Sequence, residues 1–279
     1  MVSRIWQLAH GRHLALGDIG LVMGIFNVTP DSFSDGGSFA GLDAAVAQAR
    51  AMREAGASII DVGGESTRPG AEPVSAEEEQ ARVLPVVEAL AGEGMVVSLD
   101  TYRAETARLG IAAGAHIVND VWGLSREPLI AQVAAETGAG LVIMHTGRGR
   151  EKLADPIEDQ FVFLRRALEV AASAGVASEQ IVLDPGFGFA KEEASDNIAL
   201  IARHRELTAL GMPLMAGVSR KRFLGTLTGR DAAARDTATA AANALLRLAG
   251  ADIFRVHDVA STRDALCVAD AVRNWGERA

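Results

Sequence analysis

Hydrophobic and polar positions divide the chain into two alternating kinds of segment. Short runs of β-branched and aliphatic residues are followed by longer alanine-rich stretches with apolar residues at helical spacing. Most of the short runs are apolar throughout, as expected of strands buried on both faces. They predict strands at Leu21–Phe26, Ser58–Val62, Met95–Leu99, Ala115–Val118, Gly140–Met144, Gln180–Leu183, Pro213–Ala216 and Ala251–Val256.

The amphipathic stretches between these runs predict helices. They cover Leu42–Ala55, Ala76–Leu90, Ala104–Ala113, Pro128–Glu136, Ile157–Ala174, Asn197–Leu210, Thr237–Leu248 and Arg263–Trp275. Several end at a glycine where a helix C-cap would fall, namely Gly56, Gly138, Gly175, Gly211 and Gly250. The phrase Ala-Gly-Ala recurs at 55–57, 113–115 and 249–251, and it indicates a helix stop that leads into the next strand.

Eight strand–helix units in 279 residues predict a (β/α)8 TIM barrel. A doubly wound open sheet is the competing arrangement, but the dinucleotide-binding glycine pattern typical of it is absent and eight units fit closure better. No low-complexity linker divides the chain, so residues 1–279 are expected to form a single domain.

Composition and charge narrow the range of partners. Hydrophobic residues make up 49% of the chain, which excludes a disordered protein. The formal net charge of −9 disfavours nucleic acid and anionic membranes as general partners. The apolar stretches, such as Leu141–Met144, are too short to span a bilayer. Cys267 is the single cysteine, so a soluble protein of the reducing cytoplasm is expected, with Cys267 packed in the last helix.

Polar residues follow every predicted strand, and in a barrel these positions form the active face. The segments are Asn27–Gly37, Gly63–Gly70, Asp100–Thr101, Asn119–Asp120, His145–Arg148, Asp184–Phe189, Ser219–Arg222 and Arg255–Asp258. Any one of them could be a turn or a helix cap. Together they indicate a binding site.

Two kinds of side chain in this ring suggest two kinds of ligand group. Positive or potentially positive side chains on an acidic chain favour a small anion, a phosphate or a carboxylate. These are Arg68, Arg220, Lys221, Arg255 and His257. Carboxylates and an amide suit a flat heterocycle with N–H and amino donors, such as a pterin or a purine. These are Asp100, Asn119 and Asp184.

Signals for metal binding and for nucleophilic catalysis are weak. No transition-metal spacing of histidines or cysteines occurs, and Asn27 with nearby carboxylates suits Mg²⁺ only if substrate phosphates supply further oxygens. His145 is either a ligand or a histidine hydrogen-bonded in the barrel mouth. The sequence has neither a Gly-x-Ser-x-Gly elbow nor a phosphate-binding P-loop.

Two loops are rich in glycine, serine, proline and aspartate, at 27–37 and 63–72. They are read either as mobile surface loops or as lids that order over a substrate. Phe33 lies in such a polar loop and is interpreted as a cover for an aromatic ligand.

Seven motifs from Met23 to Val259, in order, resemble those of the dihydropteroate synthase family. They are NVTPDSFSDGG (27–37), GGESTRPGA (63–71), LDT (99–101), ND (119–120), LDPGFGFAK (183–191), SRKRF (219–223) and RVHDV (255–259). The resemblance implies a pterin-binding barrel that joins a dihydropterin methyl diphosphate to the amine of 4-aminobenzoate. The products would be dihydropteroate and diphosphate, in folate biosynthesis.

The same resemblance implies roles for individual residues. The pterin would be held by Asp100, Asn119, Met144, Asp184 and Lys221. The diphosphate would be bound by Asn27, Ser66, Arg68, Arg255 and His257, with Mg²⁺ held at Asn27. The 4-aminobenzoate site, which sulfonamides would share, would comprise Phe33, Thr67, Pro69, Phe187, Ser219, Arg220 and Lys221. Asp31 and Asp35 would shape the closed site, and Asp35 is counted with Asn27, Arg68, Lys221, Arg255 and His257 as catalytic. The resemblance also implies a homodimer.

One segment departs from the family pattern, because Thr146 stands where a second methionine is more usual. The contacts of the loop at 145–150 are therefore an open question. Two alternatives are a pterin-binding methyltransferase, which should lack the ESTRPG and SRKRF loops, and a non-catalytic paralogue. The intact residues Asn27, Arg68, Asp100, Asp184, Lys221, Arg255 and His257 argue against the paralogue.

Overall fold

Eight parallel strands form the inner wall of the molecule. The computed structural model describes residues 4–28, 39–65 and 74–276. The strands are β3 (Leu21–Asn27), β4 (Ile59–Gly63), β5 (Val97–Asp100), β6 (Ile117–Asp120), β7 (Gly140–Met144), β8 (Ile181–Asp184), β9 (Met215–Ala216) and β10 (Ile253–Val256). They pair in the order β8-β7-β6-β5-β4-β3-β10-β9. The two ends of this order also meet: a parallel bridge joins Leu183 of β8 to Leu214, the residue before β9, so the sheet closes on itself. The (β/α)8 barrel is confirmed, and the open sheet is excluded.

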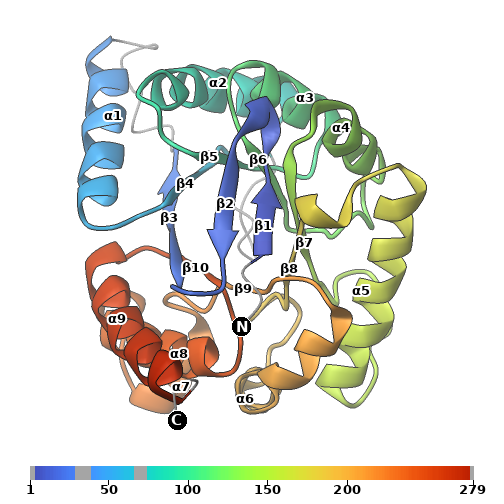
Figure 1. Cartoon of the computed structure of the whole chain (residues 1–279), viewed down its shortest axis with the longest axis vertical. Coiled ribbons are helices and arrows are strands. Elements are labelled where there is room, and N and C mark those ends of the chain that lie inside the picture. The colour runs from blue at the N-terminus through green and yellow to red at the C-terminus, as the bar shows by residue number, and fades with distance from the viewer. Residues whose placement is uncertain (1–3, 29–38, 66–73, 277–279) are drawn as a thin grey trace.

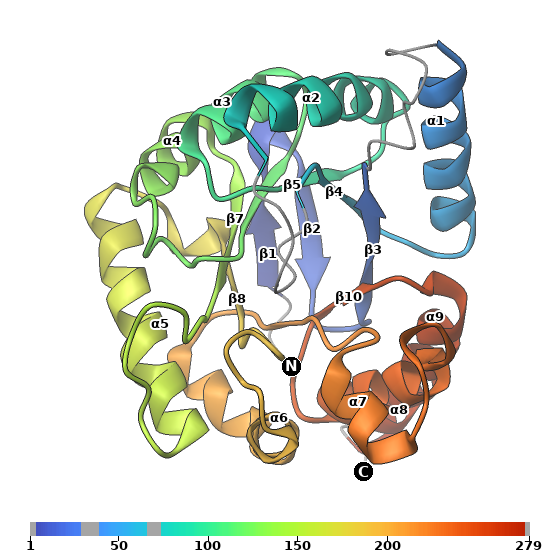
Figure 2. The ribbon, with the colours of Figure 1, turned by 180° about the vertical axis from the view of Figure 1, so that it is seen from behind.

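Helices surround the strands as an outer ring (Figures 1 and 2). They are α1 (Phe39–Glu54), α2 (Ala76–Gly92), α3 (Ala104–Ala112), α4 (Leu129–Thr137), α5 (Pro156–Ser173), α6 (Ala194–Ala202), α7 (Arg222–Thr228), α8 (Asp236–Leu248) and α9 (Val259–Gly276). Short 3-10 turns lie at Ala9–Gly11, Ser178–Gln180, His204–Leu210 and Ala232–Ala234.

Two helical segments differ from expectation. The helix expected over 197–210 ends at Ala202, and a 3-10 turn replaces its second half. Arg203 leaves the helical region there, with φ −108° and ψ 14°, and its guanidinium binds Asp155 at 2.8 Å. Helix α7 was not predicted, because its seven residues are too few to show a helical period.

The Ala-Gly-Ala phrases act as predicted. Gly56, Gly114 and Gly250 have φ values of +108°, +111° and +107°, a region open to glycine but strained for other residues. The residue after each glycine donates its N–H back into the helix; Ala57, for example, donates to the Met52 carbonyl at 2.9 Å. The helix is thereby capped and the chain is turned into the next strand.

A two-stranded hairpin closes one end of the barrel, and the sequence reading did not predict it. It pairs β1 (Arg4–Gln7) with β2 (His13–Leu16) and lies across the barrel centre in both views (Figures 1 and 2). Trp6 is buried and donates its indole N–H to the Gln180 carbonyl at 2.8 Å. Gln180 directly precedes β8, so the hairpin covers the amino-terminal end of the strands and leaves the opposite end for a site.

Side chains that point into the barrel change from apolar to polar along the strands. The amino-terminal positions form a buried interior cluster, and on four strands the next inward position, two residues on, is polar. The pairs are Ile59 and Asp61, Ile117 and Asn119, Val182 and Asp184, and Ile253 and Arg255. The interior apolar cluster, called the plug below, therefore underlies a layer of polar side chains at the carboxyl ends of the strands. This polar layer, which includes Asp61, Asn119, Asp184 and Arg255, is called the floor.

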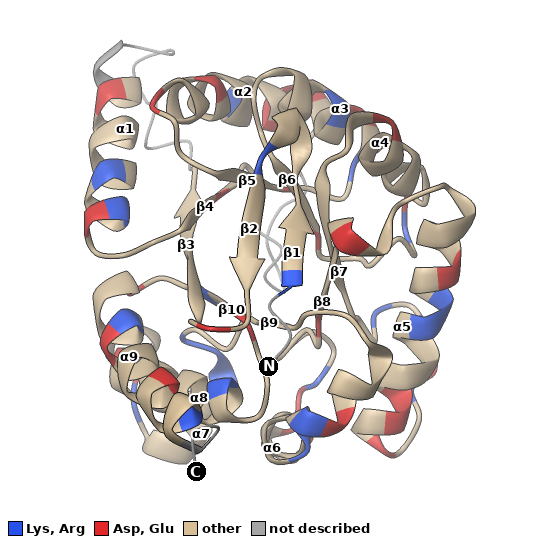
Figure 3. Cartoon of the chain, in the orientation of Figure 1, with Lys and Arg blue, Asp and Glu red and all other residues tan. Residues whose placement is uncertain are grey.

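Acidic and basic residues are interspersed along the outer helices (Figure 3). None of the helices within the described ranges is long and apolar enough to cross a membrane.

Cys267 is exposed on α9, which corrects the expectation that it is packed. Its neighbour Leu266 occupies the inward face of that helix instead.

Candidate active site

A hollow lies at the carboxyl ends of strands β6 to β10, on the side opposite the hairpin. It holds about 250 Å³ of empty space, part of it open to solvent. Its lining residues are Asn119, Val121, Met144, Asp184, Phe189, Gly217, Lys221 and Arg255. The five residues that the resemblance assigned to the pterin therefore include four in this lining: Asn119, Met144, Asp184 and Lys221.

The fifth, Asp100, reaches the same floor through Arg255. The Arg255 guanidinium donates to Asp100 at 2.7 Å and to Asp61 at 2.6 Å, so it joins β10 to β4 and β5. Burial raises the pKa of Asp100 to about 7, while the positive charge of Arg255 favours its ionised form. Arg255 has further N–H donors, because these two bonds use only part of the guanidinium fork.

Asn119 presents an acceptor. Its amide nitrogen lies 3.3 Å from both oxygens of Asp61, and a carboxylate oxygen only accepts there, which fixes the orientation of the amide. The side-chain oxygen, buried beside the hollow, has no hydrogen-bond partner among the described residues. A ligand donor at this point would satisfy it.

Asp184 presents a second acceptor. One carboxylate oxygen accepts the Gly186 N–H at 2.7 Å, and the other lies 3.4 Å from where a Cβ on Gly217 would stand. Gly186 has φ +64°, and a Cβ there would lie 2.0 Å from the His145 carbonyl oxygen, so only glycine fits. Burial raises the pKa of Asp184.

Lys221 and Phe189 form the half-buried rim of the hollow. The Lys221 ammonium lies 4.0 Å from the centroid of the Phe189 ring. Burial, then the charge of Arg255, lowers the pKa of Lys221 to about 8. This rim is therefore a cation beside an aromatic face, next to the buried acceptors.

Ser219 and His257 come together at the ends of β9 and β10. The Ser219 hydroxyl oxygen accepts the backbone N–H of His257 at 3.1 Å and lies 2.9 Å from its Nδ1. The serine therefore holds the imidazole in place beside the strand that carries Arg255.

Phe187 and Arg220, both predicted for the 4-aminobenzoate site, are directed away from the hollow. Phe187 is fully buried and stacks near His204 and Phe223, on the helix side of the barrel wall. Arg220 has φ +55° and turns its guanidinium to Asp236, with two contacts of 2.7 Å. Seven further predictions lie outside the described residues: Asp31, Phe33, Asp35, Ser66, Thr67, Arg68 and Pro69.

Two side-chain oxygens lie near Gly63, where a magnesium role was expected for Asn27. The side-chain oxygen of Asn27 and one carboxylate oxygen of Asp100 each lie 3.8 Å from where a Cβ on Gly63 would stand. Among the described residues no group of three or more His, Cys, Asp or Glu could hold a metal. These hard oxygens fit Mg²⁺ only together with phosphate oxygens of a ligand.

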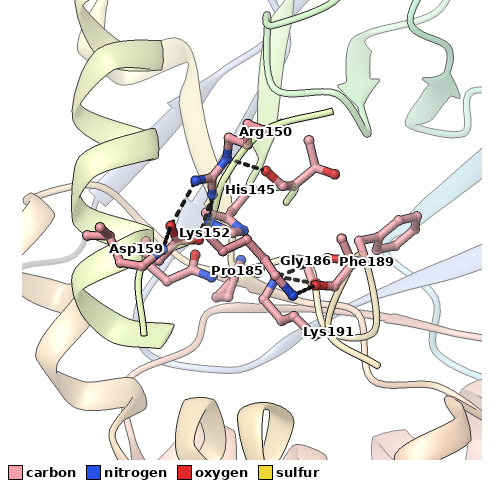
Figure 4. A network of polar contacts seen from close by, with 12 residues as sticks. His145, Arg150, Lys152, Asp159, Pro185, Gly186, Phe189 and Lys191 are labelled. Carbon is pink, nitrogen blue, oxygen red and sulfur yellow. Dashed lines mark hydrogen bonds and ion pairs between the residues drawn. The ribbon is translucent and has the colours of Figure 1, made fainter. Parts of the chain in front are cut away.

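A network of polar side chains, most of them buried, binds the backbone of the loop that carries Phe189 to the hollow (Figure 4). Lys191 donates to Nδ1 of His145 at 3.0 Å and to the carbonyl oxygens of Gly186 and Phe189 at 2.9 and 3.3 Å. Nε2 of His145 lies 2.9 Å from Asp159, which also binds Arg150. Burial lowers the pKa of His145 to about 4 and that of Lys191 to about 7. Of the two readings of His145, the structure shows the hydrogen-bonded one.

Asp61 and Phe189 belong to the site, and the sequence reading missed both. Asp61 stands alone as a charge inside an otherwise apolar strand, two residues after Ile59, and that position was the available signal. Phe189 was not distinguishable from Phe187, because the turns at Gly186 and Gly188 break any periodicity of side-chain direction.

The chain matches known proteins along nearly its whole length. The profile of a family described as "Pterin binding enzyme" matches residues 23–257. A dihydropteroate synthase of Bacillus subtilis (strain 168) is 44% identical over 273 residues, which cover 97% of this chain and 95% of the relative. One of Escherichia coli (strain K12) is 46% identical over 258 residues, covering 90% of each chain.

Solved structures agree with these matches. Dihydropteroate synthase of Xanthomonas albilineans with 4-aminobenzoic acid has a TM-score of 0.89 and 42% identity, covering 98% of this chain and 99% of that one. The Burkholderia cenocepacia enzyme complexed with 7,8-dihydropteroate has a TM-score of 0.88 and 38% identity, covering all of both chains. The chain thus belongs to the pterin-binding enzyme family and, within it, to the dihydropteroate synthases.

Proposed function

We propose that this chain condenses a 7,8-dihydropterin-6-ylmethyl diphosphate with 4-aminobenzoate, giving 7,8-dihydropteroate and diphosphate in folate biosynthesis. The observation that carries the proposal is the hollow itself. It combines the buried acceptors Asn119 and Asp184 with the cations Lys221 and Arg255, in a chain of this family. One hollow thereby offers acceptors to a flat heterocycle and positive charge to an anionic leaving group.

The pterin is placed on the floor of the hollow. Its ring N–H and amino groups donate to the Asp184 carboxylate and to the Asn119 oxygen, which has no partner among the described residues. Met144 contributes apolar contact to the ring, and Lys221 donates to a ring acceptor from the rim. A neutral analogue that lacks these donors would leave buried acceptors unpaired, so the floor selects for the heterocycle.

The diphosphate leaves by a dissociative step. Arg255 lies near the end of β10 and His257 directly follows that strand; the Arg255 guanidinium supplies positive charge to the departing group, His257 supplies a hydrogen-bonding imidazole beside it, and the resemblance adds Arg68 and Ser66. The pterin ring nitrogens share the positive charge that remains on the methylene carbon. The carboxylates of Asp100 and Asp184 lie on the same floor and favour that charge.

Magnesium is proposed as the metal that accompanies the diphosphate. Asn27 would help to hold it, with the phosphate oxygens as further hard ligands. When bound, it would supply neutralising charge to the leaving group.

The second substrate needs no strong base. An aromatic amine is unprotonated at neutral pH and attacks the methylene carbon with its lone pair; its proton then passes to solvent or a nearby acceptor. The loops that hold Phe33, Thr67 and Pro69 are expected to exclude water, which would otherwise capture the cation.

Diphosphate release that depends on 4-aminobenzoate tests this function directly. The purified chain is mixed with dihydropterin diphosphate and Mg²⁺, and diphosphate is measured by a coupled assay. Release should require 4-aminobenzoate and produce dihydropteroate in equal amount. In calorimetric titration, 4-aminobenzoate should bind only after diphosphate or the pterin substrate has bound. If 4-aminobenzoate binds equally well without either of them, the result counts against the synthase.

A homodimer is proposed for the assembly. Leu245 of α8 and Val268, Val272 and Trp275 of α9 are all more than half exposed, and these two helices pack side by side. Large exposed apolar side chains on two neighbouring helices favour a protein contact. Sedimentation should show a dimer, and Val272→Asp should convert it to a monomer.

The cytoplasmic location expected from the single cysteine stays a prediction.

A further inference from the structure

Cations and aromatic rings alternate around the rim of the barrel mouth. Arg126 lies 4.1 Å from the ring centroid of Tyr102 and 5.0 Å from that of Trp122. Arg148 follows, 5.2 Å from Trp122 and 4.7 Å from Phe189. Lys221 completes the series, 4.0 Å from Phe189. The loops after β5, β6, β7, β8 and β9 are thus linked by stacked pairs.

Arg148 holds the central place in this series, and it belongs to the loop that departs from the family pattern. Thr146, fully buried, accepts the backbone N–H of Arg148 at 3.2 Å and so shapes the turn that presents it. The half-buried Arg148 guanidinium then spans the distance between Trp122, after β6, and Phe189, after β8. Thr146, the residue that departs from the family pattern, thus helps to set the position of Arg148 through this hydrogen bond.

We propose that Arg148 is a positioning residue for the second substrate: by stacking between Trp122 and Phe189, it fixes the Phe189 ring against Lys221 and thereby shapes the aromatic entry to the hollow. The inference rests on the function proposed above and deepens it.

The geometry assigns the effect to 4-aminobenzoate and not to the pterin. Asn119 and Asp184 form the buried floor, where their hydrogen bonds go to Asp61 and to the Gly186 N–H, whereas Arg148 stacks on the rings of Trp122 and Phe189. Phe189 and Lys221 form the half-buried rim, so a substrate that arrives after the floor is occupied must pass their faces. A flat aromatic acid suits that entry, because its ring stacks on Phe189 and its carboxylate favours nearby positive charge.

The test compares four proteins by initial rates of diphosphate release: wild type, Arg148→Met, Arg148→Lys and Arg126→Met. Arg126→Met is the matched control, because Arg126 also stacks on Trp122 but does not contact Phe189. Arg148→Met should raise KM for 4-aminobenzoate by about 3- to 30-fold, the range of a partly buried cation–π contact. KM for the pterin substrate should change by less than about twofold, Arg148→Lys should recover most of the loss, and Arg126→Met should resemble wild type.

The pH profile is a second readout that a merely structural role would not move. Within the described part of the chain, the charged groups that act most on Lys221 are Arg255, Asp184, Arg148 and Asp100, and Arg148 is among those that lower its pKa. Loss of the Arg148 charge should therefore move the alkaline limb of kcat/KM to higher pH, while Arg148→Lys should not.

Three results would overturn the proposal: an unchanged KM for 4-aminobenzoate, equal increases in both KM values, or the same effect from Arg126→Met. Arg148→Gln gives the same comparison if methionine unfolds the loop. Failure of the proposed function looks different, because wild-type protein would then release no diphosphate in response to 4-aminobenzoate.

Discussion

The Nε atom of Arg255 donates to a carboxylate oxygen of Asp61 at 2.6 Å, and the two residues lie 194 positions apart in the chain. Asp61 is fully buried, and it also lies within reach of the Asn119 amide. The same guanidinium binds Asp100, so one arginine fixes a carboxylate on each of two strands. The polar floor of the hollow is organised around this arginine.

Removing Asp61 should therefore destabilise the fold. In Asp61→Ala the buried amide of Asn119 and one side of Arg255 lose their acceptor, which should lower the free energy of unfolding by about 3 kcal/mol. Urea denaturation measures the change. Glu136→Ala is the control: its ion pair with Arg108 is about half exposed on both sides, and its loss should cost less than about 1 kcal/mol. Equal losses from the two variants would contradict the assigned role of Asp61.

Lys221→Ala should affect turnover and spare the fold. The ammonium lies on the rim of the hollow, where it faces the substrates, and loss of such a positioned charge should reduce kcat by about 100-fold. The free energy of unfolding should change by less than about 1 kcal/mol, because the side chain is outside the core. Lys152→Ala provides a lysine control, since Lys152 donates to the Ala190 carbonyl and does not line the hollow. Wild-type turnover in Lys221→Ala would show that Lys221 takes no part in the reaction.

Asp184→Asn should weaken binding of the pterin. The substitution replaces a charged acceptor with an amide whose nitrogen only donates, so affinity should fall by about 10- to 100-fold. Calorimetric titration with a pterin ligand measures it. Asp120→Asn is a useful comparison, because the Asp120 carboxylate turns away to bind the backbone N–H groups of Trp122 and Leu124. It should lower stability while leaving pterin affinity within about threefold. Unchanged affinity in Asp184→Asn would place that carboxylate outside the binding site.

Lys191 should make stability depend on pH above neutrality. Burial lowers its pKa to about 7, so above that value the unfolded chain binds a proton that the folded chain does not. Stability from this group therefore rises with pH until the unfolded lysine also titrates near 10, by up to about 1.4 kcal/mol per pH unit. Lys191→Met removes this contribution, so its unfolding free energy should rise less steeply than that of wild type between pH 7.5 and about 9.5. Parallel curves for the two proteins would refute the prediction.

The hairpin should matter for stability and not for substrate binding. Trp6→Ala empties a fully buried site beneath the barrel and removes a hydrogen bond, at a cost of about 3–5 kcal/mol. KM values should stay near wild type, because the hollow lies at the opposite end of the strands. Ile5→Ala, next to it on β1 and 47% exposed, should change stability by less than about 0.5 kcal/mol. A large rise in either KM in Trp6→Ala would show that the plug and the floor are coupled.

Local pattern predicted most of the barrel wall. Strand β7 begins and ends where expected, at Gly140 and Met144, because a run of apolar residues between a glycine and a polar loop is clear in one dimension. The helix stops at Gly56, Gly138, Gly175, Gly211 and Gly250 all have positive φ, as their position after a helix predicted. Both signals depend only on neighbouring residues.

Elements with short or irregular patterns were not predictable in this way. Strand β1 has four residues, of which only Trp6 is buried, so its contact with the barrel interior has no periodic signature. Helix α7 is similarly short. Phe187 and Phe189 differ by two positions, yet one lies in the core and the other on the rim, because Gly186 before Phe187 and Gly188 between the two rings both have left-handed backbone.

The sequence by itself determined the eight strand–helix units and the chemical type of the residues at the strand ends, since period and turn chemistry are local properties. Only the tertiary structure decided which of those residues meet. Closure of the barrel brings Asp61, Asp100 and Arg255 to one floor, and it places Lys191 behind Phe189. Such pairings depend on strand order and inward direction, which arise when the sheet closes and cannot be read along a single chain.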